Sequence, residues 1–357
     1  LQGLLTERDV RFIGDEALAR DRMTPRDRLV AHTGTIGFAD AEALMARHKV
    51  KKLPLMNPDG TVFGLITARD LDNHRRHPFA TRDSHGRLRV AAAVGATGDF
   101  LERAAEVLRV GADALVIDIA HGHSLVMDRA ISALRTRFPE VELIAGNVAT
   151  EEGARFLVER GVNGVKVGIG PGGGCTTRLT TNFGVPQVEA LVRARLGAGD
   201  RVPLIADGGI RRDGGIAQAL LFGGDSVMLG SAFAGTEETP GDIVMKSVLM
   251  SESQKVVQVP FKVFRGMASV SAVKDRLDLE EADAQEVEAF GAEGLEVSVP
   301  ARGSVRTVIQ NMLKHLCSSI SYGGASSLAD LRARFVADPD RYVRHLTEAS
   351  RMESFHR

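Results

Sequence analysis

The sequence contains little cysteine, no tryptophan and almost no net charge. Its two cysteines, Cys175 and Cys317, are far too few for the disulfide framework of a small secreted protein, and they favour a reducing compartment. A formal net charge of −1 provides neither a basic surface for nucleic acid nor an acidic tail. We therefore expect a cytoplasmic protein that does not bind nucleic acid.

Long apolar segments are also missing. The sequence has no run of roughly 18 apolar residues, and the opening residues LQGLLTERDV lack the basic flank and apolar centre of a signal peptide. No membrane partner is therefore expected. The chain does have 44% hydrophobic residues, 25% charged residues and 38 glycines in 357 residues, a composition typical of α/β proteins. This length fits one large domain and one smaller domain.

A short repeat divides the first part of the chain. The segment GLLTERDV from Gly3 returns as GLITARDL from Gly64, so we expect two copies of one small module, the first of them largely missing. The residues between the copies predict a loop, an amphipathic helix and two strands around an Asp-Gly turn. Thr67 and Asp70 either cap the following helix or bind a ligand, and the capping interpretation is favoured.

From about residue 87 onward, short apolar segments alternate with helical stretches. These segments, most of which end in Gly, Asp, Asn or Ser, are RLRVAAAVG, DALVIDIA, VELIAGNVA, GVKVGIG, VPLIADGG and DSVMLGSA. The alternation predicts a parallel sheet covered on both faces, and polar residues at the strand ends are typical of a TIM barrel active site. A closed barrel needs eight units, so the sequence predicts six of the eight, with the other two either absent or located before residue 1.

The segment VKVGIGPGGGCTTRLTTNFGVPQ, residues 165–187, is rich in glycine. Gly168, Gly170 and Gly173 match the spacing of a dinucleotide-binding turn, but CTTRLTTNFG is expected to be a loop rather than the helix that such a turn requires. No acidic residue follows in a strand at the required distance, so this interpretation is disfavoured. A glycine-rich loop can instead direct backbone carbonyl or N–H groups toward a cation or a phosphate.

The two cysteines are expected to lie in different environments. The polar neighbours Thr176, Thr177 and Arg178 argue against burial of Cys175, which is therefore a candidate nucleophile at the mouth of the barrel. Burial as a small hydrophobic residue is the alternative for any single cysteine. Cys317 belongs to the helical segment TVIQNMLKHLCSSI, and there we expect burial in the core.

Six motifs follow one another along the chain: DIAHGHS, AGNVAT, GIGPGGGCTTR, ADGGI, MLGSAFAGT and FRGMAS. Together they resemble the IMP dehydrogenase and GMP reductase family. The resemblance includes RLRVAAAVG directly after the repeat region, since many members insert a CBS pair into the barrel. It implies a CBS module at residues 1–78, a catalytic TIM (β/α)8 barrel at 79–357, a mobile flap at about 268–300 and a C-terminal tail at 324–357.

The resemblance also implies which residues perform the chemistry. Cys175 would add to purine C2 and form a thioimidate, with Thr177 beside it and Arg276 of the flap as the general base. The residues implied to bind the substrate are Gly173, Asp207, Gly209, Gly230, Ser231, Phe264, Gly266, Met267 and Glu293. The residues implied to face a nicotinamide cofactor are Asp118, Ser124, Asn147 and Gly168.

A potassium ion and an oligomer are implied as well. The ion would be held by the backbone carbonyls of Gly170, Gly172 and Cys175 and completed by the C-terminal tail of a neighbouring subunit. The tail LTEASRMESFHR has Ser350 where the family usually has glycine. The resemblance therefore implies a homotetramer or octamer, with a further nucleotide as a candidate ligand of the CBS module.

Three further positions depart from the family pattern. Gly173 replaces a serine and Phe264 replaces a tyrosine, so two phosphate-binding hydroxyl groups are lost, each worth about 0.5 to 1.5 kcal/mol. Arg276 is followed by Leu277, where the dehydrogenase flap has a tyrosine. Three functions stay open: an IMP dehydrogenase that uses NAD to form XMP, a GMP reductase that uses NADPH and releases ammonia, or an inactive nucleotide-sensing regulator. The AHGHS motif and the tail favour the dehydrogenase.

Overall fold

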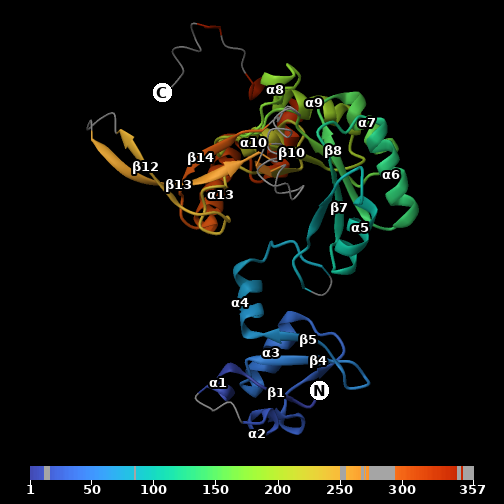
Figure 1. The fold of residues 1–357 in the computed structure, drawn as a ribbon, viewed down its shortest axis with the longest axis vertical. Helices are drawn as coiled ribbons and strands as arrows, with labels where there is room; N and C mark the ends of the chain where they lie inside the picture. Colours follow the sequence, from blue (N-terminus) through green and yellow to red (C-terminus); the bar gives the residue numbers. More distant parts are fainter. Residues whose placement is uncertain are drawn as a thin grey trace, which may run out of the picture. The chain divides into compact units, whose positions relative to one another are not determined.

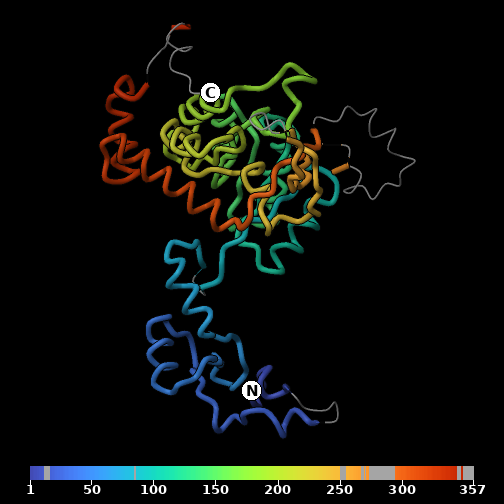
Figure 2. Tube along the Cα trace, turned by 90° about the vertical axis from the view of Figure 1, so that its left-hand side faces the viewer, coloured from blue at the N-terminus to red at the C-terminus, as the bar shows by residue number. Residues whose placement is uncertain are grey.

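The computed structural model describes residues 1–11, 17–83, 86–249, 255–266, 269, 271–272, 294–343 and 347–348. The chain divides into two compact units, Leu1–Arg89 and Val90–Arg357, which Figures 1 and 2 trace in the colours of the sequence. No helix in these ranges is both long enough and apolar enough to cross a membrane.

The first unit has the helix and the two strands that its sequence predicts. A three-stranded sheet has the order β3-β4-β5, with β4 antiparallel to β5 and parallel to β3. Helix α3 packs on this sheet through Ala41 and Met45, which are buried together with Leu53, Ile66 and Leu71. The first elements of this unit are β1 Gly3–Leu4, α1 Glu7–Val10, α2 Ala19–Arg22, β2 Thr24–Pro25 and η1 Arg26–Arg28. They are followed by β3 His32–Thr33, α3 Phe38–His48, β4 Lys52–Met56, β5 Val62–Thr67 and α4 Ala68–Arg76.

The sequence repeat corresponds to a repeated helix cap. The Thr67 hydroxyl donates to the Asp70 carboxylate over 2.7 Å and accepts from the Asp70 N–H over 3.3 Å, at the start of α4. Thr6 donates to Asp9 in the same way, from its hydroxyl over 2.6 Å and from its backbone N–H over 2.8 Å, at the start of α1. The side-chain bond from Thr6 holds the pKa of Asp9 below its ordinary value. The expected capping role of Thr67 and Asp70 is confirmed.

The second unit contains the predicted parallel sheet. Six parallel strands have the order β11-β10-β9-β8-β7-β6, so each strand lies beside its neighbour in sequence, as in a TIM barrel. The strands are β6 Ala91–Val94, β7 Ala114–Asp118, β8 Glu142–Val148, β9 Gly164–Val167, β10 Leu204–Asp207 and β11 Ser226–Met228. The fold is thus a TIM barrel of which the described residues form a six-stranded part, as the sequence predicts.

Helices follow five of these strands and cover the sheet, and Figure 1 shows α6 and α7 on the outer side of β7 and β8. Fully buried aliphatic side chains fill the space between helices and strands, among them Leu115, Leu143 and Leu204 from the strands and Leu134 and Leu157 from the helices. The helices are α5 Phe100–Arg109, α6 Leu125–Arg137, α7 Glu151–Glu159, α9 Gln187–Ala198 and α10 Gly214–Leu221.

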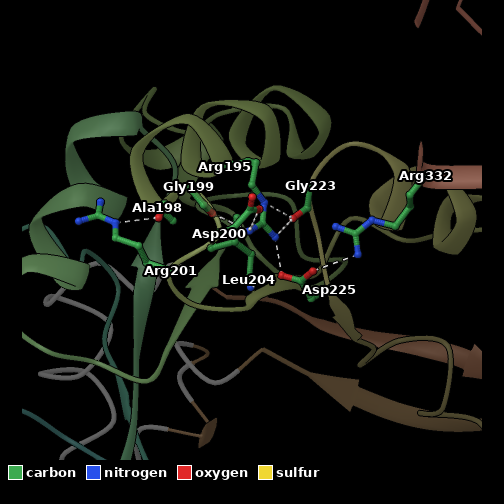
Figure 3. Close-up of polar contacts among 9 residues, drawn as sticks. All are labelled: Arg195, Ala198, Gly199, Asp200, Arg201, Leu204, Gly223, Asp225 and Arg332. Atoms are coloured by element: carbon green, nitrogen blue, oxygen red, sulfur yellow. Dashed lines mark hydrogen bonds and ion pairs between the residues drawn. The ribbon is translucent and has the colours of Figure 1, made fainter. Parts of the chain in front are cut away.

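A charged cluster around Asp225 fastens the end of the sheet where β10 and β11 begin (Figure 3). The Asp225 carboxylate accepts from Leu204 N–H at 2.9 Å, from the guanidinium of Arg195 on α9, and from Arg332 Nη1 at 3.0 Å. Arg332 belongs to α14, Leu328–Ala337. Burial raises the pKa of Asp225, but the hydrogen bonds from Leu204 and the two arginines outweigh it, so this pKa lies below its ordinary value.

The last part of the chain adds a small antiparallel sheet and a long helix. The sheet has the order β12-β13-β14, with β12 Val244–Leu249, β13 Val256–Arg265 and β14 Glu296–Pro300. Residues 296–300 belong to the range expected for the flap, and in the structure they form a strand paired with β13. Helix α13, Val305–Tyr322, and α14 follow, and η3, Pro339–Arg341, comes after α14.

The prediction that Cys317 lies in the core is wrong, because Cys317 is exposed on α13. The side of α13 that packs on the barrel passes through Val308, Met312 and Leu316, at a spacing of one helical turn. Cys317 follows Leu316 and is therefore rotated by about 100° away from that side. Leu313 is likewise exposed, so apolar composition alone does not identify the buried side of this helix.

Candidate active site

The polar residues at the strand ends gather at one edge of the sheet, as the barrel prediction requires. Asp118 ends β7, Asp207 ends β10, and Asn147 lies near the end of β8. The Asn147 side-chain amide donates to Asp207 Oδ2 over 2.9 Å and to the Gly168 carbonyl over 2.7 Å. Asn147 on β8, Gly168 directly after β9 and Asp207 on β10 are therefore joined by hydrogen bonds, and all three are residues that the sequence singled out.

Lys166 on β9 is a member of this group that the sequence analysis missed. Its side chain is only 4% exposed, and its Nζ lies 3.2 Å from Asp118 Oδ1 and also contacts Asp207 Oδ2. The signal in the sequence was a single lysine within the apolar strand GVKVGIG. A lysine is almost never fully buried unless it is paired, so its partners could have been sought among nearby strand-end acids.

Gln187, the first residue of α9, is a second residue that the sequence analysis missed. Its side-chain amide donates to the Val167 carbonyl over 2.8 Å, and its Cβ and Cγ lie against Gly209. Two buried amide oxygens, Gln187 Oε1 and Asn147 Oδ1, have no hydrogen-bond partner among the residues that the structure describes. Buried acceptors are normally satisfied, so these two oxygens are suited to a donor that a ligand brings.

Cys175 lies exposed on the loop that follows β9, as expected. Its backbone N–H donates to the Gly172 carbonyl over 3.2 Å, which closes a turn directly before the thiol. Its thiol donates to the Thr177 hydroxyl over 3.3 Å. The neighbouring Thr176 is buried at 7% exposure, so the chain around the thiol is anchored while the thiol itself is accessible.

The segment after Cys175 is not only a loop, so that expectation is corrected. Residues Thr177–Thr180 form α8, a single helical turn. Thr181 extends the turn, because its N–H and its hydroxyl both donate to the Thr177 carbonyl, over 2.9 and 2.7 Å. A four-residue helix that begins well after the end of β9 differs from the long helix of a dinucleotide-binding turn, so that interpretation stays disfavoured.

The residues expected to bind a phosphate lie around the first part of this loop. A Cβ on Gly173 would lie 3.4 Å from Ser231 Oγ, and a Cβ on Gly230 would lie 3.6 Å from the Phe264 ring. The loop is fixed against the antiparallel sheet, because Leu295 N–H donates to the Gly174 carbonyl over 2.9 Å. Gly173, Gly230, Ser231 and Phe264 are thus brought together by the fold.

Gly266 and Gly209 are two further residues expected in the substrate site. Gly266 N–H donates to the Leu295 carbonyl over 3.1 Å, and a Cβ on Gly266 would lie 2.8 Å from the Gly174 carbonyl oxygen. Gly209 has a φ of +79°, a backbone conformation that favours glycine, and lies against Pro171. Three further predicted site residues, Met267, Arg276 and Glu293, lie outside the described residues.

The residues expected to face a cofactor differ in their surroundings. The Asp118 side chain is 43% exposed beside Lys166, and Asn147 offers its unpartnered Oδ1. Ser124 is the N-cap of α6, where its hydroxyl accepts from Met127 N–H over 3.3 Å. Asp118 and Asn147 can therefore accept hydrogen bonds from a ligand, whereas the Ser124 hydroxyl already accepts one from its own helix.

The loop gives no support for the predicted potassium ion. The carbonyl of Gly172 accepts the N–H of Cys175 in the turn described above. The Arg178 side chain lies against Gly170, with Nε 3.0 Å from the position of a Cβ, and its Nη2 donates to the Val185 carbonyl over 2.6 Å. Within the described ranges, no cluster of His, Cys, Asp and Glu side chains could hold a metal ion either. Potassium binding stays a prediction.

A parallel sheet with its polar residues at the strand ends, next to a glycine-rich loop that carries an accessible thiol, is the arrangement of a TIM-barrel enzyme. Residues 29–356 match the model of the IMP dehydrogenase / GMP reductase domain. The chain belongs to this family of oxidoreductases, as the motifs in its sequence indicate.

Relatives and solved structures agree with this membership. The chain is 40% identical to an inosine-5′-monophosphate dehydrogenase from Aquifex aeolicus over 342 residues, which cover 94% of this chain and 68% of that protein. The dehydrogenase from Streptococcus pyogenes is 43% identical, with coverages of 94% and 67%. A GMP reductase variant from Trypanosoma brucei in complex with guanosine 5′-monophosphate matches with a TM-score of 0.82 and 34% identity, covering 99% of this chain and 70% of that one. The chain thus spans about two thirds of the length of these proteins.

Proposed function

We propose that this chain contains the catalytic site of an IMP dehydrogenase, which converts IMP, NAD and water into XMP and NADH. The observation that carries the proposal is the exposed Cys175 thiol, hydrogen-bonded to Thr177 at 3.3 Å on the loop beyond β9. The identity of 40 to 43% to dehydrogenases, against 34% to the structurally similar reductase, supports the oxidative direction.

The proposed reaction uses Cys175 as a covalent catalyst. The deprotonated sulfur adds to C2 of the purine, a hydride leaves C2, and a thioimidate joins Sγ to C2. Water then adds to C2 and loses a proton, the bond between sulfur and C2 breaks, and XMP leaves with the thiol restored. Bound NAD supplies the acceptor for the hydride. Arg276 is proposed as the base that takes the proton from water, a role that an arginine fills only where its surroundings favour the neutral form.

Asp207 and the glycine-rich turns are proposed to bind the nucleotide. A carboxylate at a strand end can accept hydrogen bonds from both hydroxyl groups of a ribose, and Asp207 is fixed there by Lys166 and Asn147. The backbone N–H groups of Gly209, Gly230 and Ser231 are proposed to bind the 5′-phosphate, because glycine lets a phosphate approach the main chain closely. Gly173 and Gly266 border the same site, and Met267 and Glu293 are proposed to contact the base.

The described residues fit a nicotinamide cofactor beside this nucleotide. Asp118 has an exposed carboxylate that can accept from ribose hydroxyl groups, and Asn147 Oδ1 is a buried acceptor without a protein partner. Gly168 lies next to Asn147, because its carbonyl accepts a hydrogen bond from the Asn147 amide. NAD is proposed for the dehydrogenase and NADPH for the reductase alternative.

GMP reductase is the second candidate, and one observation favours it. Arg276 is followed by Leu277, so the flap lacks the arginine-tyrosine pair of the dehydrogenases. An assay of the full-length protein distinguishes the two directions: IMP with NAD is expected to yield XMP and NADH. Oxidation of NADPH with GMP and release of ammonia, without any XMP from IMP, would contradict the dehydrogenase.

An inactive nucleotide-sensing regulator is the third candidate, and it is tested by the thiol itself. A purine nucleotide with a halogen at C2 can transfer its ring to a reactive cysteine with loss of halide. Intact-mass analysis should therefore find one adduct on Cys175. Absence of the adduct in the full-length protein would favour the regulator.

The remaining assignments are proposed from the same resemblance. Residues 1–78 are proposed as a CBS module that binds a nucleotide, residues 79–357 as the barrel with its flap and tail, and the assembly as a homotetramer or octamer in the cytoplasm. Size-exclusion chromatography with light scattering measures the assembly directly. A monomer at working concentration would contradict it.

A further inference from the structure

Lys166 is a buried cation between two carboxylates that the proposed function assigns to different ligands. The side chain is 4% exposed, and its Nζ contacts Asp207 Oδ2 and lies 3.2 Å from Asp118 Oδ1. Two carboxylates in one site repel each other, and a buried ammonium is costly without partners. The three groups therefore stabilise one another only as a set.

The register of the sheet explains how one lysine reaches both carboxylates. Asp118 on β7 pairs with Gly146 on β8, and Gly146 pairs with Lys166 on β9. A Cβ on Gly146 would lie 2.5 Å from the Lys166 Cβ, so only a glycine leaves room for the lysine chain to pass β8. Asp207 lies on the other side, on the adjacent strand β10.

Lys166 is buried, but its contacts at Asp207 connect it directly to the proposed ligand site. Lys166 Nζ and the Asn147 amide converge on the same oxygen, Oδ2, and so fix the orientation of the carboxylate. The Asp207 side chain remains 22% exposed and that of Asp118 43% exposed, so both carboxylates stay accessible. The lysine lies beneath them, buried.

We propose that Lys166 is a positioning residue that holds Asp207 for the nucleotide and Asp118 for the cofactor, and thereby couples the two binding sites. This inference rests on the proposed function for the ligand of each carboxylate. Because one ammonium holds both carboxylates, loss of its charge weakens the binding of both ligands. By linkage, each bound ligand favours the carboxylate arrangement that binds the other ligand.

The test compares Lys166→Met with Lys166→Arg in the full-length protein. The methionine variant is expected to raise the calorimetric Kd of IMP and the KM of NAD about tenfold or more, with a smaller change in kcat, as for interactions used in binding. The arginine variant keeps the positive charge, so its Kd for IMP and its KM for NAD should lie closer to the wild-type values than those of the methionine variant. Wild-type affinities in the methionine variant, or equal losses in both variants, overturn the proposal.

Lys262 provides a matched control for the loss of a buried ammonium. Its side chain is also buried, but its Nζ donates to the backbone carbonyls of Thr236 at 2.8 Å and Thr239 at 2.6 Å, away from the carboxylates. Lys262→Met should lower the melting temperature while leaving the IMP Kd within about threefold. A loss of IMP affinity equal to that of Lys166→Met would show a general folding effect and overturn the positioning role.

A second variant and a second ligand extend the test. If Lys166→Met does not fold, Lys166→Gln retains a neutral donor and should still lose affinity for both ligands; wild-type affinities in that variant overturn the proposal. The same Kd comparison is made with GMP. A wild-type protein that reduces GMP but does not oxidise IMP contradicts the proposed direction alone, whereas equal GMP affinity in wild type and Lys166→Met contradicts the inference alone.

Discussion

The Cys175 thiol donates a hydrogen bond to the Thr177 hydroxyl over 3.3 Å, and Thr177 is the first residue of the one-turn helix α8. This bond joins the exposed thiol, the proposed nucleophile, to an ordered element, while the Gly172 turn fixes the backbone on the other side of Cys175. The thiol is thus oriented from both directions. Orientation of a nucleophile before the substrate binds lowers the entropic part of the barrier.

Replacement of the nucleophile separates catalysis from binding. Cys175→Ala should abolish turnover and leave the Kd of IMP within about tenfold, because the contacts to ribose and phosphate survive. Cys317→Ala is the matched control, since Cys317 is also exposed but lies on α13 away from the loop. Steady-state assays and calorimetry measure both variants. Undiminished turnover in Cys175→Ala would remove the thioimidate mechanism.

Restoring the two hydroxyl groups at the phosphate site should strengthen nucleotide binding. The double variant Gly173→Ser with Phe264→Tyr returns two neutral donors, each worth about 0.5 to 1.5 kcal/mol. The serine fits, because a Cβ on Gly173 lies at an ordinary 3.4 Å from Ser231 Oγ. The Kd of IMP is expected to fall about fivefold or more, while that of inosine, which has no phosphate, stays unchanged. Equal changes for IMP and inosine would place these residues elsewhere than at the phosphate.

The Asp225 cluster should contribute a stability that depends on pH. Because the pKa of Asp225 is lowered in the folded chain, its contribution is present above the ordinary carboxyl value of 3.8 and is lost as the pH falls below it. Asp225→Asn should therefore lower the free energy of unfolding by about 1 to 2 kcal/mol at neutral pH, and the difference should shrink toward acid pH. Urea denaturation followed by circular dichroism measures it.

Asp200 supplies the control for that measurement. Its carboxylate lies 3.8 Å from the same Arg195 but is fully exposed, so Asp200→Asn should change the free energy of unfolding by about 0 to 0.5 kcal/mol. Equal losses in the two variants would show that long-range charge, rather than the hydrogen bonds at Asp225, stabilises this end of the sheet.

The sequence predicted the fold well because its signals are local. Each of the six apolar segments became a parallel strand, and the strand-end rule predicted that polar residues such as Asp207 and Asn147 gather at one edge of the sheet, where the structure shows these two in contact. The capping of α4 by Thr67 also followed from sequence spacing alone. These features depend on periodicity and on residue type at element ends, which a single sequence contains.

The failures have three different physical causes. Lys166 was missed because its partners, Asp118 and Asp207, come from other strands, and only the three-dimensional register brings them within reach. Cys317 was misplaced because the apolar residues of α13 extend around more than one side of the helix. Helix α8 was predicted to be part of a loop because a four-residue helix is too short to show a helical periodicity in the sequence.

The most direct test of the central claim is to trap the bond between Cys175 and the purine. Full-length protein mixed with IMP and NAD and quenched with acid during the first turnover should show, by peptide mass mapping, a purine nucleotide attached to the peptide that contains Cys175. NADH should form at one equivalent per site in the same burst, followed by XMP. NADH and XMP formed with no adduct, and at an unchanged rate in Cys175→Ala, would contradict the account.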